Sequence, residues 1–135
     1  MKISPKLVAA LLLAGGGALP PGAWAQQVVV IANPGVQVGA GDIGDIFLGE
    51  KQFAGSVKLV PVDNAGLQAA FLSKAMNMDA NKYNGRWVKK SFRDGVNPPP
   101  LKSGDAEVTE YVKRTPGAVG YVGSVPAGVT VVNKY

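Results

Sequence analysis

The sequence of 135 residues contains no cysteine and no histidine. Without cysteine there is no disulfide, so packing alone must hold the fold together. The two absences also exclude Ser-His-Asp and Cys-His nucleophile systems, histidine general bases and zinc sites built from the usual ligands. A carboxylate pair or a lysine base remains, but the sequence places no two carboxylates convincingly together. We therefore expect no enzyme, no cofactor and no metal site.

Residues 1–25 have the pattern of a secretory signal. Lys2 and Lys6 precede an apolar stretch over residues 7–14, and the segment ends Ala23-Trp24-Ala25, which is an A-x-A cleavage site. The alternative is a membrane anchor, but the apolar stretch is far shorter than the roughly 20 residues that a spanning helix needs. We expect cleavage after Ala25, a periplasmic location, and one mature domain over residues 26–135.

Basic residues outnumber acidic ones, 14 to 9, which gives a formal net charge of +5. Loss of Lys2 and Lys6 with the signal lowers the charge further, and no basic run is longer than Lys89-Lys90. Nucleic acid is therefore a poor partner. Five cations repeat at three or four residues in one expected helix: Lys82, Arg86, Lys89, Lys90 and Arg93. This basic face is either solvated or meets an anionic membrane surface, a polyanion or an acidic partner protein.

The apolar pattern predicts elements in the order β-α-β-α-α-α-β-β. Strands are expected over residues 27–32, 57–62, 118–122 and 129–132, and helices over 42–48, 67–76, 80–92 and from 103 or 105 to 114. The first strand is continuously apolar and β-branched, as central strands are, whereas Pro61 favours a strand end or a sheet edge. The order predicts an α/β fold with a mixed sheet flanked by helices.

The expected helix over residues 80–92 carries large apolar side chains. We interpret Tyr83, Trp87, Val88 and Phe92 as its buried stripe. The run Pro98-Pro99-Pro100 behind it cannot continue a helix and predicts an extended connection.

Four short strings resemble, in order, the phosphate-type periplasmic solute-binding proteins of ABC transporters. They are the opening strand with Asn33, IFLGEK at 46–51, VPVD at 60–63, and TPGAVGYV at 115–122 behind a helix of the type at 107–112. Together they extend over most of residues 28–132. The resemblance implies a single lobe of the class II periplasmic-binding-protein fold. It also implies non-catalytic binding of a small phosphate-like anion, with a link to phosphate ABC transport.

The loop after the second strand departs from this family. The family's loop carries an Arg and a Ser/Gly/Thr cluster that hydrogen-bond the anion, whereas residues 63–68 read Asp-Asn-Ala-Gly-Leu-Gln. The Asp63 carboxylate would repel phosphate, and the chain lacks room for the second lobe that closes over the ligand.

Candidate ligand-binding residues lie at the carboxyl ends of the expected strands, where open α/β sheets bind ligands. The backbone N–H groups of Gly66, Leu67 and Gln68, at the start of the expected helix, can hold an anion. The alternative is an ordinary helix cap by Asp63 or Asn64. Asn33 is otherwise a turn residue, and Tyr121 is otherwise an ordinary half-buried strand position. The ligand-binding set is Asn33, Asp63, Asn64, Gly66, Leu67, Gln68 and Tyr121.

These observations favour a non-catalytic binding module for a small anion or a protein partner, in which two copies can pair to form a cleft. The alternative is a structural or interaction module of the cell envelope with no small-molecule ligand. It would dock through the basic face or the loop at Gly35–Gly41. A secreted hydrolase working through carboxylates, with Asp63 as the first residue to test, is the remote third hypothesis.

Overall fold

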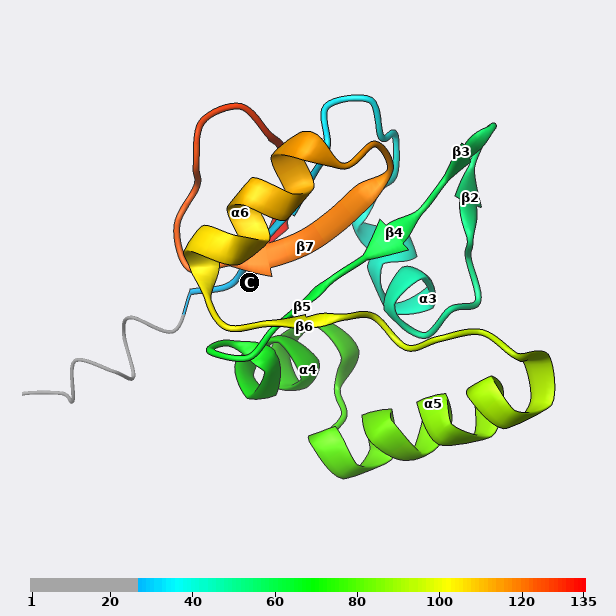
Figure 1. The fold of residues 1–135 in the computed structure, drawn as a ribbon. Coiled ribbons are helices and arrows are strands. Elements are labelled where there is room, and N and C mark those ends of the chain that lie inside the picture. Colours follow the sequence, from blue (N-terminus) through cyan, green and yellow to red (C-terminus); the bar gives the residue numbers. More distant parts are fainter. Residues whose placement is uncertain (1–26) are drawn as a thin grey trace, which may run out of the picture.

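The computed structural model describes residues 27–135. The expected signal and its cleavage site lie outside these residues, so export stays a prediction. The elements are β1 (Val29–Ala32), the 3-10 helix η1 (Ala40–Asp42), α3 (Ile43–Phe47), β2 (Phe53–Ala54), β3 (Val57–Lys58), β4 (Val60–Pro61), β5 (Asp63–Asn64), α4 (Gln68–Met76), α5 (Ala80–Asp94), β6 (Leu101–Lys102), α6 (Asp105–Arg114), β7 (Ala118–Val122) and β8 (Thr130–Lys134) (Figure 1). No helix among the described residues has the length and apolar character to span a membrane.

The central sheet has four strands in the order β4-β7-β1-β8. β1 is antiparallel to both β7 and β8, whereas β4 is parallel to β7, so the sheet is mixed as predicted. All four residues of β1 are buried, which confirms the central strand buried on both faces. β4 is an edge strand: Val60 and Val62 donate to β7 or the turn before it, and Pro61 between them has no N–H to leave unpaired.

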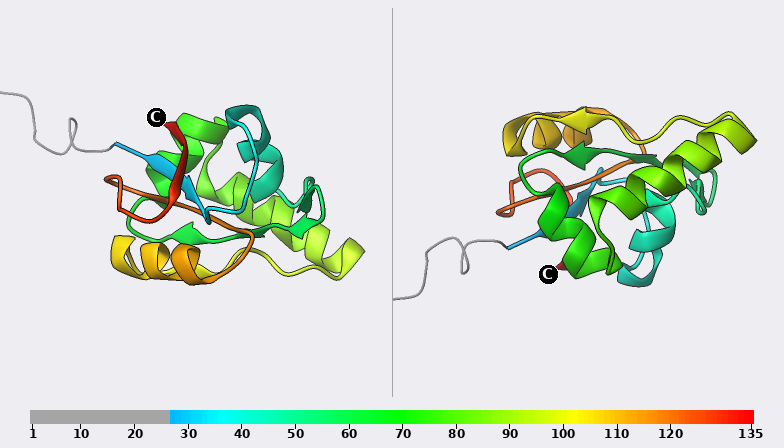
Figure 2. Two further views of the ribbon diagram at one scale, coloured as in Figure 1. Left: turned by 90° about the horizontal axis from the view of Figure 1, so that it is seen from above. Right: turned by 90° about the horizontal axis from the view of Figure 1, so that it is seen from below.

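Helices cover both faces of this sheet, and Figure 2 shows α6 on one side and α3, α4 and α5 on the other. The pleat of β1 separates two apolar clusters. Val30 packs with Phe47, Phe71 and Tyr121 on the side of α3 and α4, and its neighbour Val29 packs with valines of α6 on the other side. The expected mixed α/β sheet flanked by helices is therefore confirmed.

The single strand expected over residues 57–62 is divided between two short strands, β3 and β4, and the chain then continues into a third, β5, each with a different partner. β3 forms a hairpin with β2, β4 joins the central sheet, and β5 leaves that sheet to pair in parallel with β6. Where the chain leaves β7 and begins to pair with β6, the Asp63 N–H donates to the Pro100 carbonyl at 2.8 Å. The short strands β2, β5 and β6 were missed because pairs of two residues leave no periodic pattern in the sequence.

The predicted buried stripe of α5 is half wrong. Tyr83 and Trp87 are buried, but Val88 is 69% and Phe92 is 95% exposed, and Lys90 is buried instead. Tyr83, Trp87 and Lys90 follow one another at four and three residues, so they share one narrow face. Val88 is turned about 100° from Trp87 around the helix axis and leaves that face. α5 therefore packs on the domain with one face only.

Candidate functional site

Asp63 lies at the centre of a buried polar cluster. The Tyr121 hydroxyl donates to Asp63 Oδ1 at 2.7 Å, and the Tyr83 hydroxyl donates to Oδ2 at 2.8 Å. The Gln68 side chain also hydrogen-bonds this carboxyl group. β5, β7, α4 and α5 thus meet at the carboxyl group of Asp63, a residue that is only 2% exposed.

The strand pairing explains why Asp63 points into this cluster. Val62, one residue earlier, packs into the apolar cluster on the α6 side of the sheet. Because successive side chains of an extended chain point to opposite faces, Asp63 faces the side of α4 and α5.

Burial controls the electrostatics of the cluster. It raises the pKa of Asp63 above 3.8, against the opposing effect of the hydrogen bonds from Tyr121, Tyr83 and Gln68. Burial, and then the nearby Asp63 charge, raises the pKa of both tyrosines, so each stays a neutral hydrogen-bond donor.

Asn64 closes the loop that leads into α4. Its Nδ2 donates to Asp105 Oδ1 at 2.8 Å and to the Tyr121 carbonyl at 2.9 Å, while its Oδ1 accepts from the Gly66 N–H at 3.0 Å. The Leu67 N–H donates to the Asn64 carbonyl. Two of the three backbone donors expected to hold an anion are therefore engaged within the loop. The expected cap by Asp63 or Asn64 is corrected as well, because Leu67 occupies the cap position of α4.

Asn33 lies apart from the other candidate residues. Its Nδ2 donates to the Val112 carbonyl at 3.0 Å and to the Lys113 carbonyl at 3.3 Å, and its Oδ1 accepts from the Gly35 N–H. β1 runs antiparallel to β7, so Asn33 sits beside the start of β7. β4 runs parallel to β7, so Asp63, which follows β4, lies beside the end of β7. Of the candidate residues, the structure brings Asp63, Asn64, Gln68 and Tyr121 together. Asn33 lies elsewhere and hydrogen-bonds the end of α6.

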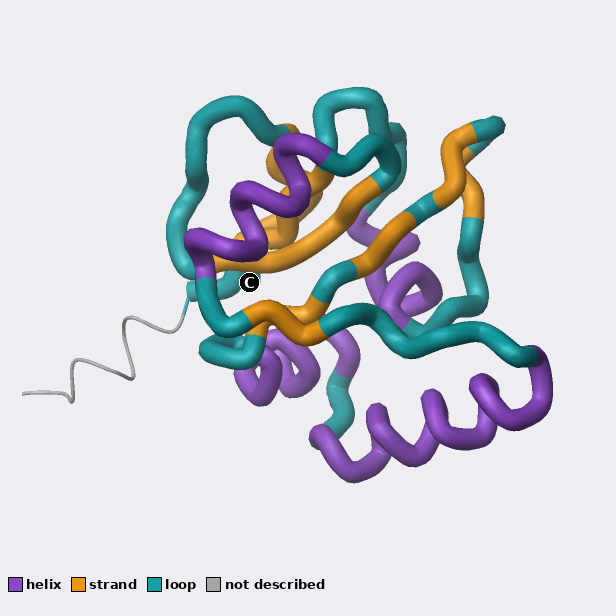
Figure 3. Tube along the Cα trace, viewed as in Figure 1, coloured by secondary structure: helices purple, strands orange, loops and turns teal. Residues whose placement is uncertain are grey.

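A groove of about 730 Å³ opens above the Asp63 cluster, between α5 and residues 98–101. We call it the α5 groove. Figure 3 shows that the connection from α5 to β6, which supplies the second wall, runs as a loop. The lining residues are Asp63, Gln68, Tyr83, Asn84, Trp87, Val88, Ser91, Phe92, Pro98, Pro99 and Leu101. Val88, Phe92 and Leu101 expose more than half of their surface, so the groove is apolar at its rim and has a buried carboxyl group at its floor.

Sequence reasoning missed this groove because it assigned Val88 and Phe92 to the core. A usable signal was present. Tyr83 with Trp87, and Val88 with Phe92, are two pairs at four residues, each on a different side of the helix. Two apolar sides are more than a helix at the surface needs for one core, so one side was free to face a ligand.

Within residues 27–135, no three acidic side chains gather into a group that could hold a metal ion.

Tyr121, expected as half-buried or cleft-lining, is fully buried and reaches the groove only through its hydrogen bond to Asp63.

No protein-family model matches the chain, and no curated protein sequence matches it. Among solved structures, the chain is similar to the crystal structure of PstS from Borrelia burgdorferi, with a TM-score of 0.48 and 14% sequence identity. The similarity covers 87% of this chain and 54% of that protein, so this chain spans about half of its length. A similarity this weak identifies neither a family nor a ligand.

Proposed function

We propose that the chain is an exported, non-catalytic binding module that holds an apolar and acidic segment of a partner protein in the α5 groove. The observation that carries this proposal is the exposure of Val88 and Phe92, 69% and 95%, on the groove side of α5. Leu101 faces them from the other wall, with Pro98 and Pro99 beside it.

Exposed apolar side chains gathered in one place favour a binding site. Burial of one such side chain stabilises a fold by about 1.5–3 kcal/mol. Val88 and Phe92 of α5 do not contribute this stabilisation, because Tyr83 and Trp87 are the residues that pack into the core. Single exposed apolar residues are common on proteins, but a cluster of them mostly marks an interaction surface.

Shape and charge select the partner. The surface is concave, which suits an inserted peptide segment better than a flat bilayer. α5 also carries the five cations of the basic face and Asp94 as its only acidic residue. Two copies facing each other through α5 would bring these cations together, so a second copy of this chain is disfavoured. An acidic segment complements them.

A small phosphate-like anion at the loop of residues 64–68 is the alternative ligand. Gly66 and Leu67 have already committed their N–H groups within that loop, and the buried Asp63 carboxyl group lies next to it. We therefore rank the protein partner first.

Photo-crosslinking in the producing cell tests the proposal. A benzophenone amino acid at position 92 should crosslink a partner, whereas the same group at the exposed position 110 of α6 should not. The identified partner is then purified, and its affinity is measured for the wild type and for the double variant Val88→Ser/Phe92→Ser. We expect loss of affinity in the variant. Equal affinity for both proteins, or no crosslink specific to position 92, would overturn the proposal.

A further inference from the structure

A small crevice lies on the other flank of α5, against the end of α3. It has a volume of about 120 Å³ and is lined by Leu48, Glu50, Arg86, Lys89, Lys90 and Arg93. We call it the basic crevice. It belongs to the basic face that the sequence shows, and it is separate from the α5 groove.

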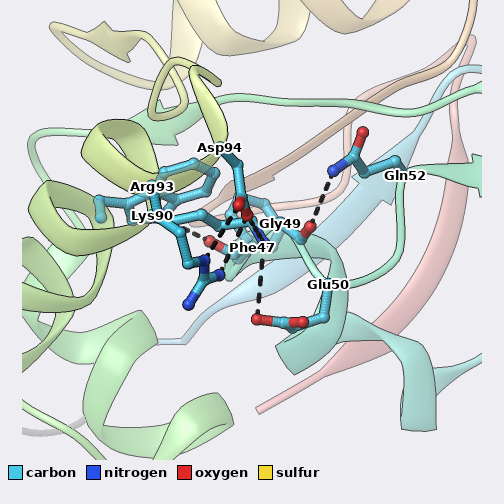
Figure 4. A network of polar contacts seen from close by, with 8 residues as sticks. Phe47, Gly49, Glu50, Gln52, Lys90, Arg93 and Asp94 are labelled. Carbon is cyan, nitrogen blue, oxygen red and sulfur yellow. Dashed lines mark hydrogen bonds and ion pairs between the residues drawn. The ribbon is translucent and has the colours of Figure 1, made fainter.

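Lys90 lines the basic crevice and is held in place by the polar contacts that Figure 4 shows. Only 8% of the residue is exposed, and its ammonium group lies 3.7 Å from Glu50 Oε2 and 3.3 Å from Asp94 Oδ2. Its alkyl chain passes close over Gly49, where an added Cβ would lie 2.8 Å from Lys90 Cε. The neighbouring Trp87 Nε1–H donates to the Phe47 carbonyl at 2.9 Å, which fixes α5 on α3.

Arg93 is held in the same network. Its Nε and one terminal nitrogen donate to the two carboxylate oxygens of Asp94, each at 3.0 Å. These hydrogen bonds from Arg93 are the main reason that the pKa of Asp94 falls to about 2. Asp94 therefore stays ionised and keeps Arg93 in place over the physiological pH range.

The basic crevice keeps a surplus of positive charge. Four cations line it against Glu50 as the only acidic lining residue. Among residues 27–135, Arg86 and Lys89 form no ion pair, so their donors are available. The volume corresponds to roughly four water molecules at ~30 Å³ each, which is room for a carboxylate group.

We propose that the basic crevice binds an Asp or Glu side chain of the same partner segment whose apolar side chains enter the α5 groove. This inference rests on the proposed function, because the segment must cross α5 to reach both places. A helix with its side chains is about 10–12 Å wide, and an extended chain advances about 3.3 Å per residue. The acidic residue therefore lies three or four positions from the apolar anchor.

A displayed library of random peptides, selected on the folded protein, tests this spacing. We expect peptides with Phe, Leu or Trp and an Asp or Glu three or four positions away. The affinity of a selected peptide, measured by fluorescence anisotropy, should fall about tenfold on Arg86→Ala/Lys89→Ala. The double variant Lys82→Ala/Lys134→Ala removes the same charge outside the basic crevice and should retain the affinity. Circular dichroism checks that all variants are folded.

The outcomes separate the two proposals. Enrichment of apolar residues without a spaced acidic residue would overturn the basic crevice and leave the α5 groove standing. An equal loss of affinity in both double variants would do the same, because it would show a general charge effect. Failure to enrich any apolar peptide that Val88→Ser/Phe92→Ser weakens would overturn the docking function itself, and this inference with it.

Discussion

The Tyr83 hydroxyl donates a hydrogen bond of 2.8 Å to Asp63 Oδ2 and so ties α5 to β5. Tyr121 of β7 donates to the other oxygen of the same carboxyl group at 2.7 Å. Because one buried carboxyl group accepts from both elements, the position of α5 over the sheet depends on Asp63. The same residue thus helps to hold α5, one wall of the α5 groove, and also lines the groove.

Asp63→Asn should change how stability depends on pH. Burial raises the pKa of Asp63 in the folded protein above 3.8, so folding favours the protonated form. The contribution of Asp63 to stability is therefore fully present below about pH 3.8 and is lost as the pH rises through the folded-state pKa. The Asn variant does not undergo this loss. The free energy of unfolding of the variant minus that of the wild type should become more positive as pH rises through this window.

Urea unfolding over a pH series measures this difference. Glu110→Gln removes one exposed carboxyl group of α6 and is the matched control. Parallel curves for Asp63→Asn and the wild type would contradict the buried position of Asp63.

Gly117→Ala should strongly destabilise the protein. Gly117 has a φ of +85°, and a Cβ there would collide with the Lys58 carbonyl oxygen where β3 passes the turn into β7. The left-handed conformation alone costs roughly 1–2 kcal/mol, and the collision with backbone adds to it. We expect a loss of at least about 2 kcal/mol in urea unfolding.

Gly44→Ala is the matched control for this substitution. Gly44 lies inside α3, and beyond its chain neighbours and the backbone of its own helix no described atom lies within 4 Å of an added Cβ. Alanine there should stabilise the protein by up to about 1 kcal/mol. Similar effects of the two substitutions would contradict the turn geometry at Gly117.

Phosphate should not stabilise the protein more than sulfate does. A thermal-shift series on residues 26–135, with sulfate as a control, measures this directly. A ligand that binds only the folded form adds about 2.7 kcal/mol at a hundredfold excess over Kd, which is several degrees for a domain of this size. We expect no saturable, phosphate-selective rise, because the Gly66 and Leu67 N–H groups are engaged. Such a rise would make the small anion the leading ligand.

The sequence predicts the larger elements because their signals are local. A continuous β-branched run predicts a buried central strand, and it becomes β1. Pro61 predicts a sheet edge, and it lies in the edge strand β4. The helices α4, α5 and α6 also lie where periodicity and end signals place them. The division of residues 57–64 among three strand partners could not be predicted, because it depends on pairing with residues 53–54, 118–119 and 101–102.

The site depends on contacts that no local pattern encodes. Asp63 and Tyr121 are 58 positions apart in the sequence, and their contact arises only when β4 pairs in parallel with β7. The exposure of Phe92 likewise depends on which face of α5 meets the domain. Periodicity gives the angle between Phe92 and Trp87 but does not say which of the two turns inward.

The most direct test of the α5 groove compares stability and binding in the double variant Val88→Ser/Phe92→Ser. Because both side chains are mostly exposed, its free energy of unfolding should match that of the wild type. Its affinity for a peptide selected on the wild type should fall at least tenfold, since each lost apolar contact is worth about 1.5–3 kcal/mol when buried. Unchanged affinity, or a loss of stability as large as that of a core substitution, would contradict a free α5 groove that binds a partner.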